Sequence, residues 1–464
     1  MTLTITDAAA ALRAGETTSV ELVQQAIDAA DRTDGQVGAF ITRFVDSSLA
    51  AARRADEALA AGAEVGSLHG IPLGIKDIIT TDEAPSTAQS VVHDPAWSHG
   101  DAVVVARLRE AGGIVMGKTS TMEFACGLPD ASKPFPVPRN PWNLDTWPGG
   151  SSSGTGSGVA AGMFLGGLGT DTGGSIRIPA AFCGITGLMP TFGRVPKSGC
   201  VPLGYTLDHI GPMARSARDC ALMLQAMAGY DASDVTALDV PVPDYLAALS
   251  GNVTGLRIGV DRLVGDDDDP AISGALDAAI DVLASLGAEV IDVQLPYYTE
   301  VLAALGVIVA GEMLAYHLPD AQTRLPDFVA SNRLGLGKHT FYTGADYVQA
   351  QRVRRVAHRA LTALYDDVDL VLTPTAVVGA LRLDDLGDDF STWFGRIHTP
   401  YWDAMGNPVI SVPMGYTAAG LPLGLQLAGR AFDEATVLRA ADAYQEVTDS
   451  HLEQPPLTTA AVAA

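Results

Sequence analysis

The most constraining feature of the sequence is a stretch rich in glycine and serine near the middle of the chain. It covers residues 147–158, resumes over residues 169–179, and carries Ser151 and Ser175. Glycine permits close backbone approach, and successive N–H groups in such loops can form anion-binding nests. An apolar segment, residues 159–168, separates the two halves, whereas a flexible linker would be polar throughout. We therefore expect two serine-bearing loops held face to face by a core element.

The composition limits the class of protein. The chain has 464 residues, of which 47% are hydrophobic, so it can bury a large core. Its formal net charge is −25, with 29 basic and 54 acidic residues. Such a surface repels phosphate backbones and anionic lipids, so we expect neither a nucleic-acid nor a membrane partner. We also expect no apolar run to provide the ~18–20 residues that a membrane helix needs.

The cysteines and the N-terminus point to a compartment. The four cysteines are scattered, form no CxxC pair and have no zinc-ligand spacing with histidine, so neither a disulfide framework nor a metal site is expected. The first residues lack the basic and apolar regions of a signal peptide. We therefore expect a reduced, cytoplasmic protein.

Helical and strand patterns alternate along the chain, which favours an α/β fold. Residues 1–65 predict a layer of helices. Residues 66–230 hold the glycine- and serine-rich stretch and predict the catalytic core, and residues 255–460 form a second half. Within the core, residues 185–212 are rich in glycine and proline and predict ordered loops.

Two short motifs match known sites but stand in the wrong context. Residues 112–119 match the phosphate-loop pattern GxxxxGK[ST], which needs a strand before it and a helix starting at the lysine. Here a helix precedes the motif and its middle is itself a predicted strand. Residues 150–154 match the nucleophile elbow GxSxG, with His209 as a candidate base. An elbow follows a strand, whereas residues 140–148 are loop sequence.

A third arrangement uses both serine-bearing loops. The N–H groups of residues 172–175 could converge on one point, as in an oxyanion hole. A serine nucleophile at Ser175 would also need a base. Lys76 lies in an apolar run, where burial lowers a lysine pKa, and Asp77 would face away in an extended strand. Two other interpretations stay open, because Lys76 could protect an edge strand and Ser175 could cap a helix.

These residues resemble the amidase signature family. The resemblance is densest over residues 148–190 and also covers residues 74–77. Weaker similarity extends through the whole chain, including residues 208–212, 346–352 and 408–413. It implies one α/β/α domain over residues 1–464, in which helices cover a central mixed β-sheet and the C-terminal half shapes the substrate pocket.

The resemblance also implies roles for individual residues. Ser175 would be the nucleophile, Ser151 a bridging serine on a cis peptide bond, and Lys76 the base of a Ser–Ser–Lys triad. Ser153 stands where the family usually has glycine. The reaction would be hydrolysis of an amide C–N bond through an acyl-enzyme, with neither metal nor cofactor. The oxyanion hole would be formed by Thr172, Gly173, Gly174 and Ser175.

The expected substrate is a small amide or carbamate. Six residues are candidates for the wall of its pocket, although core packing would explain the aromatic ones equally well: Phe124, Cys126, Trp393, Phe394, Tyr401 and Trp402. This composition favours an apolar or aromatic substrate over glutamine. We therefore expect a free-standing hydrolase, either alone or as a homodimer. The alternative is the A subunit of a glutamyl-tRNA amidotransferase, which generates ammonia from glutamine.

Overall fold

Helices and strands alternate along the chain in the computed structural model, which describes residues 3–97, 100–265, 268–389 and 395–460. The strands are β1 (Phe40–Arg43), β2 (Pro72–Lys76), β3 (Ile114–Thr119), β4 (Gly166–Asp171), β5 (Thr186–Met189), β6 (His209–Ala214), β7 (Arg257–Val260), β8 (Glu289–Asp292), β9 (Leu370–Pro374), β10 (Val409–Tyr416) and β11 (Pro422–Gly429). The helices are α1 (Ile5–Ala14), α2 (Ser19–Val37), α3 (Val45–Ala60), α4 (Val103–Glu110), α5 (Ser153–Ala160), α6 (Arg177–Cys183), α7 (Ala217–Met227), α8 (Tyr245–Ala248), α9 (Pro270–Ser285), α10 (Tyr298–Arg324), α11 (Ala330–His339), α12 (Gly344–Asp367), α13 (Pro400–Met405), α14 (Glu434–Gln445) and α15 (Pro456–Ala460).

All of these strands join one mixed sheet in the order β1-β3-β2-β4-β6-β5-β10-β11-β9-β7-β8. β2 is parallel to both β3 and β4, and β7 is parallel to both β8 and β9. The remaining pairs are antiparallel, including β5–β10, where Met189 lies opposite Val409. The sheet therefore continues from the first half of the chain into the second. The predicted α/β fold with a single domain and a mixed sheet is confirmed.

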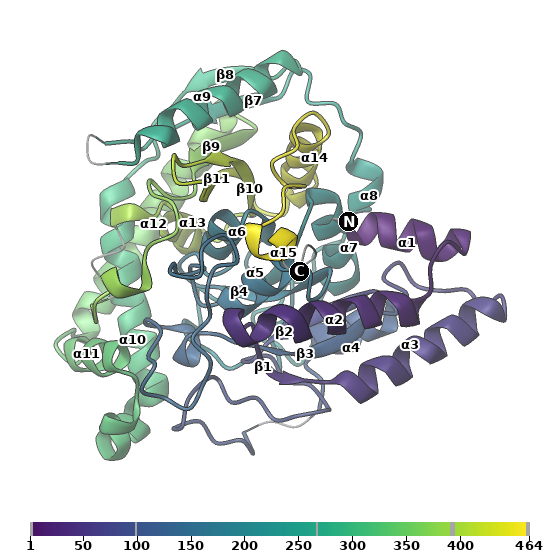
Figure 1. Ribbon diagram of the computed structural model, residues 1–464. Coiled ribbons are helices and arrows are strands. Elements are labelled where there is room, and N and C mark those ends of the chain that lie inside the picture. Colours follow the sequence, from purple (N-terminus) through teal and green to yellow (C-terminus); the bar gives the residue numbers. More distant parts are fainter. Residues whose placement is uncertain (1–2, 98–99, 266–267, 390–394, 461–464) are drawn as a thin grey trace.

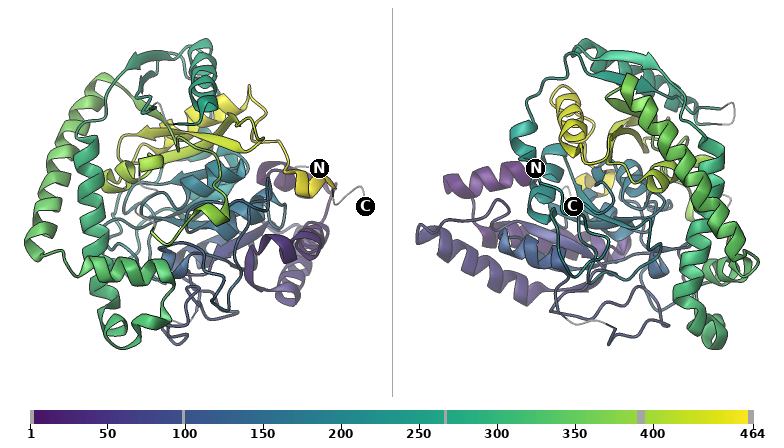
Figure 2. Two further views of the ribbon diagram at one scale, coloured as in Figure 1. Left: turned by 60° about the vertical axis from the view of Figure 1, so that its left-hand side comes forward. Right: turned by 180° about the vertical axis from the view of Figure 1, so that it is seen from behind.

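Helices cover this sheet from several sides (Figure 1). α2, α3 and α4 lie by the strands β1, β2 and β3, and α9 lies by β7 and β8. α10 and α12 run side by side along one flank in each view (Figure 2). Figure 1 also places α15, near the end of the chain, close to α7 and the start of α1.

α10 corrects the expectation that no apolar segment is long enough to span a membrane. Residues 298–327, which include it, are sufficient by length and composition, because they contain an 18-residue window with a mean hydropathy of 1.8. Their apolar side chains have other uses in this fold. Val301 and Ile308 pack in the core, and Leu302 and Leu305 line the cavity next to Ser175. The composition of α10 therefore follows from its place between the core and a cavity.

The glycine- and serine-rich stretch contains regular structure that the sequence did not predict. Residues 153–160 form α5 and residues 166–171 form β4, and every residue of both is buried. A Cβ atom on Gly154 would lie 2.5 Å from the carbonyl oxygen of Ala39, and one on Gly167 would lie 2.7 Å from that of Gly74. Glycine here permits close packing of a helix and a strand.

The loop prediction for residues 185–212 is wrong in two places. Residues 186–189 form β5 and residues 209–214 form β6, and both strands are completely buried. They lie near the middle of the sheet. Glycine and proline normally weaken strands, but here neighbouring strands and helices enclose them on all sides.

Candidate active site

Lys76 is the centre of a buried cluster of hydroxyl groups. It is the last residue of β2, and none of its surface is exposed. Its Nζ donates hydrogen bonds to Ser151 Oγ at 2.6 Å, Ser152 Oγ at 3.0 Å and Thr170 Oγ1 at 2.7 Å. Ser151 and Ser152 immediately precede α5, and Thr170 lies on β4, next to β2 in the sheet. The neighbouring elements therefore bring three hydroxyls to one amine.

Burial lowers the pKa of Lys76 to about 7, because the ammonium form loses its hydration. The more distant charges of Asp171 and Asp208 oppose this shift. Asp77 points to the other side of the strand, where Oδ2 accepts the N–H of Thr87 at 3.0 Å and Oδ1 lies 3.4 Å from Lys118 Nζ. β2 lies between β3 and β4, which excludes the interpretation of Lys76 as an edge-strand lysine.

Ser175 lies between β4 and α6 and contacts the second serine. Its Oγ accepts the backbone N–H of Ser151 at 3.0 Å. The residue preceding α6 is Ile176, and no side chain caps that helix, so the interpretation of Ser175 as an N-cap is wrong. Ser151 and Ser175 both line one cavity. The structure thus brings Lys76, Ser151 and Ser175 into one connected arrangement.

The loop before Ser175 places the predicted oxyanion-hole amides in different environments. Asp171 Oδ1 accepts the N–H of Gly174, and its Oδ2 accepts that of Ile176 at 3.2 Å. The amide of Gly174 is therefore not available to a substrate, which corrects its place in the predicted set. Within the described ranges, the N–H groups of Gly173 and Ser175 donate to no protein acceptor. Gly173, Ser175 and Thr172 line the cavity.

A buried ionic network that the sequence interpretation missed holds this loop. Arg177 Nε donates to Asp171 at 2.9 Å, and Nη2 donates to Asp403 of α13 at 2.6 Å. Arg177 also donates to the carbonyl of Thr399, whose Oγ1 donates to the carbonyl of Gly173 at 2.8 Å. The side chains of Asp171, Arg177 and Asp403 are completely buried. An aspartate and an arginine inside the apolar and glycine-rich run are the signal that could have revealed the network.

The backbone around Ser151 differs from the expectation in one respect. Every peptide bond between described residues is trans, so the implied cis bond is not found. Gly149 and Gly150 adopt positive φ values of 91° and 52°, which turn the chain into α5. Ser153 is the first residue of α5, and its buried Oγ has no hydrogen-bond partner among the described residues. This serine is therefore separate from the cluster around Lys76.

The cavity next to Ser175 has a volume of about 590 Å³. Aliphatic residues of α10 form much of its wall, and Lys338 and Asp389 form an ion pair of 2.7 Å that lines it. Cys126 lines the cavity, whereas Phe124 is not among its lining residues and packs against His317. The aliphatic residues were not predicted, because only the packing of α10 turns them towards the site. They are Leu302, Leu305, Val309 and Met313.

The remaining aromatic candidates do not form this wall. Tyr401 and Trp402 are completely buried and belong to a core cluster, which corrects their assignment to the pocket. Tyr401 stacks on Tyr298 of α10 with ring centroids 5.7 Å apart. α13 thus directs these rings into the core between itself and α10. Trp393 and Phe394 lie outside the described residues.

The structure does not support a functional role for either short motif, the phosphate-loop pattern of residues 112–119 or the nucleophile elbow of residues 150–154. α4 ends before residues 112–119, and β3 occupies residues 114–119. Lys118 is buried and donates to Ser86 Oγ at 2.8 Å. His209 contacts the carbonyl of Asp171, and burial lowers its pKa to about 3. Over the described ranges, no group of three or more histidine, cysteine, aspartate or glutamate side chains is placed to hold a metal ion.

Several known proteins are similar to this chain over nearly its whole length. The family model described as Amidase matches residues 21–438. The A subunit of the glutamyl-tRNA(Gln) amidotransferase of Roseiflexus sp. (strain RS-1) is 42% identical over 482 residues, covering 98% of each chain. A solved chain from a vestigial protein complex, linked to the evolutionary origins of an s-triazine catabolic enzyme, is 31% identical with a TM-score of 0.89 and covers 96% of this chain and 98% of that one. The native peptide amidase from Stenotrophomonas maltophilia is 30% identical with a TM-score of 0.82, over 98% of each chain.

These relatives correct the expected partners. We expected a free-standing enzyme or a homodimer that binds only a small-molecule substrate. We also excluded a nucleic-acid partner because the net charge is strongly negative. The Roseiflexus relative is one subunit of an enzyme named for a tRNA, and the s-triazine relative comes from a protein complex. Net charge describes the whole surface, so it does not reveal a local face that another protein covers.

Proposed function

The chain belongs to the Amidase family and is an amide C–N hydrolase, and on that premise we propose that it cleaves the side-chain amide of glutamine as the A subunit of a glutamyl-tRNA amidotransferase. The observation that carries the chemistry is Lys76, a buried lysine bonded to three hydroxyls. The Roseiflexus relative, similar over nearly the whole chain, supports the choice of substrate and assembly.

The proposed reaction begins with the neutral form of Lys76. Burial maintains a population of this form near neutral pH. Its Nζ accepts the hydroxyl proton of Ser151 across the 2.6 Å contact, and Ser151 Oγ accepts the proton of Ser175. Ser175 Oγ then attacks the amide carbonyl carbon. The resulting oxyanion is held by the N–H groups of Gly173 and Ser175, which have no other acceptor in the described part of the protein.

The same relay runs backwards when the C–N bond breaks. The Lys76 ammonium returns a proton through Ser151 to the leaving nitrogen, which departs as ammonia and leaves an ester on Ser175. Water then attacks this acyl-enzyme, with Lys76 and Ser151 accepting its proton. Ser175 regains its hydrogen and glutamate departs. The protein groups named here supply every proton transfer.

We place this enzyme in the cytoplasm in association with partner proteins. The four cysteines are unpaired, as is usual in a reducing compartment. The partner proteins follow from two relatives, the amidotransferase chain of Roseiflexus and the chain from the s-triazine complex.

The test measures glutamate and ammonia released from glutamine, both by the chain alone and after co-expression with the other amidotransferase chains of its source organism. We expect glutamine hydrolysis that is strongest in the assembled complex. Lys76→Ala and Ser175→Ala should each reduce kcat by roughly 10³-fold or more, while Ser153→Ala should retain activity. Full activity in either of the first two variants would contradict the triad.

The cavity supports a second candidate substrate class. Its volume of about 590 Å³ and its aliphatic wall suit an amide with a larger apolar acyl group, as does the similarity to a peptide amidase. A panel of peptide and aryl amides, assayed in the same preparations, separates the two candidates. Cleavage of this panel without glutamine hydrolysis in any preparation would favour the larger substrates and leave the triad in place.

A further inference from the structure

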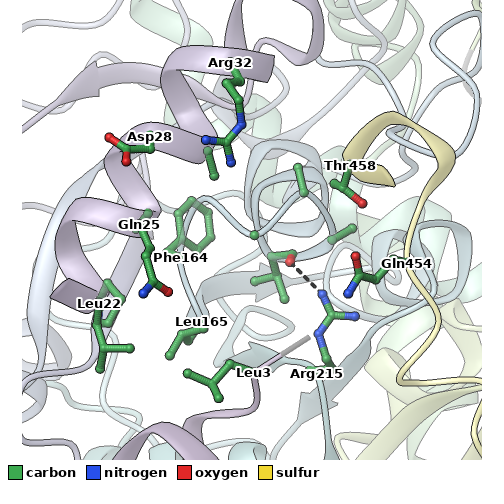
Figure 3. A pocket seen from close by; sticks show the side chains of 17 residues that line it. Leu3, Leu22, Gln25, Asp28, Arg32, Phe164, Leu165, Arg215, Gln454 and Thr458 are labelled. Atoms are coloured by element: carbon green, nitrogen blue, oxygen red, sulfur yellow. Dashed lines mark hydrogen bonds between the residues drawn. The ribbon is translucent and has the colours of Figure 1, made fainter. Parts of the chain in front are cut away.

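A second cavity lies at the opposite end of α5 from the catalytic serines. It has a volume of about 280 Å³ and shares no lining residue with the cavity at Ser175. Residues 159–162, at the end of α5, form part of its wall. α5 has eight residues and is therefore about 12 Å long. The cavity also lies between α2 and the segment that carries Gln454 and Thr458 (Figure 3).

Arg215 is a buried cation at the edge of this cavity. Arg215 is 6% exposed. Its guanidinium donates hydrogen bonds to the carbonyl of Val159 at 3.2 Å and to the carbonyls of His451 and Glu453 at 3.4 Å. Within the described ranges, no carboxylate lies within ion-pair distance of the Arg215 guanidinium. Burial lowers the pKa of Arg215 to about 10. The carboxylate of Asp219 opposes this shift but forms no ion pair with Arg215, so the guanidinium has only three long bonds to neutral oxygens, and a buried charge without a direct partner is costly.

A second arginine faces the same space. Figure 3 shows the guanidinium of Arg32, from α2, across the cavity from that of Arg215. Arg32 is exposed and forms no ion pair with the described residues. Asp28 is the acidic side chain of the lining, so two positive charges face one negative charge. A cavity with net positive charge is notable in a chain whose formal charge is −25.

The rest of the lining is partly polar and partly apolar. Gln454 places its amide group beside Arg215, and Gln25 lies on the side of Leu22 and Leu165 (Figure 3). Phe164 and Leu165 are apolar residues of the lining. The volume is near the lower end of the range for ligand pockets, so it suits a molecule of a few heavy atoms. A guanidinium fork matches the two oxygens of a carboxylate.

We propose that this cavity binds a small organic carboxylate with a short aliphatic body. The carboxylate lies between the guanidinium groups of Arg32 and Arg215. The aliphatic body packs on Phe164 and Leu165. The ligand supplies the direct carboxylate contact that Arg215 lacks among the described residues.

Butyrate titrated into the full-length protein by isothermal titration calorimetry tests this proposal. We expect saturable binding, with Kd raised about tenfold or more in Arg32→Gln and in Arg215→Gln, since each removes a charge-assisted hydrogen bond. Butyramide has the same body without the charge and should not bind. Lys338→Gln, in the cavity at Ser175, should leave the Kd unchanged and serves as the control for binding at the other site.

Two further results are decisive. Ala29 is 8% exposed and lines the cavity from α2, so Ala29→Leu should fill the space and abolish butyrate binding even if Arg215→Gln does not fold. The proposal is overturned if the parent protein shows no saturable binding at millimolar butyrate. It is also overturned if Arg32→Gln and Ala29→Leu leave the Kd unchanged, or if Lys338→Gln weakens binding.

Discussion

At the scale of single residues, the chemistry depends on the protonation of Lys76. Burial lowers its pKa to about 7, and the neutral amine is the form that accepts a proton. We therefore expect kcat/KM to rise with pH through about 7 and then level off, because the ammonium form dominates below that value. Lys76→Arg keeps the charge but stays protonated, so it should be inactive across the profile. A pH–rate profile of the parent and this variant checks the prediction, and a rate that rises on acidification would contradict it.

Two adjacent serines provide a matched pair of variants. Ser152 Oγ accepts a hydrogen bond from Lys76 at 3.0 Å, whereas Ser153 Oγ has no hydrogen-bond partner in the described part of the chain. Ser152→Ala should lower kcat by roughly 10- to 100-fold, which corresponds to the usual free energy of a hydrogen bond to a charged group. It should also move the acid limb of the profile to lower pH, because this bond stabilises the ammonium form. Ser153→Ala should change neither quantity, and equal effects of the two substitutions would refute this distinction.

Residue positions were predictable where chemistry restricts the residue type. Lys76 is the lysine of an apolar strand, and Ser175 follows a run of glycine, so both could be singled out from sequence. The directions of other groups depend on tertiary contacts. The amide of Gly174 turns towards Asp171, and Tyr401 turns into the core, because of packing that no local pattern records.

At the scale of elements, substitutions in α5 can test whether its glycines are needed for close packing against neighbouring segments. A Cβ on Gly154 would meet both Ala39 O and Ser120 N at 2.5 Å, and these are backbone atoms that cannot easily move. Gly154→Ala should destabilise the protein by about 1–3 kcal/mol, as is typical of overpacking. Gly274 is an exposed helical glycine of α9 with open space around it, so Gly274→Ala should stabilise by about 0.5–1 kcal/mol. Urea unfolding followed by circular dichroism compares them, and a stabilising Gly154→Ala would show that α5 can move away from its neighbours.

Strands were predicted correctly where the local sequence itself prefers a strand, and were missed where only neighbouring strands stabilise them. Strands such as β7 and β9 contain β-branched and aliphatic residues, which favour strand structure. β4 has the sequence Gly-Gly-Leu-Gly-Thr-Asp, which has little intrinsic preference for a strand. Its structure comes from β2 and β6 on either side. Local propensity cannot report this stabilisation by neighbours.

At the scale of the whole molecule, one buried network connects the two halves of the chain. Asp171 and Arg177 flank Ser175 in the first half, and Asp403 reaches Arg177 from α13 in the second. The resemblance to a family predicted one domain with a central mixed sheet, and the structure confirms it. The cross-chain partner of Arg177 was not predictable, since more than two hundred residues separate Arg177 and Asp403 in sequence.

The protonation of this network yields a stability prediction. Two buried carboxylates share one guanidinium, and burial together with the nearby charge of Asp171 raises the pKa of Asp403 well above its usual range. Arg177 is the main factor that lowers the pKa of Asp171 to about 2, against the opposing effect of burial. A carboxyl with a raised pKa contributes stability below its unfolded pKa and loses it as pH rises. Asp403→Asn removes this loss and can still accept the bond from Arg177.

We therefore expect the stability of Asp403→Asn relative to the parent to increase as pH rises from about 4 to 8. Asp171→Asn is the control, because it removes the charged partner of Arg177 and should cost about 3–5 kcal/mol near neutral pH. Its cost should shrink only towards pH 2, where Asp171 takes up its proton. Urea unfolding at a series of pH values measures both differences. If Asp403→Asn instead became less stable than the parent as pH rose, Asp403 would be the ionised partner of Arg177, and the assignment of charge within the network would be reversed.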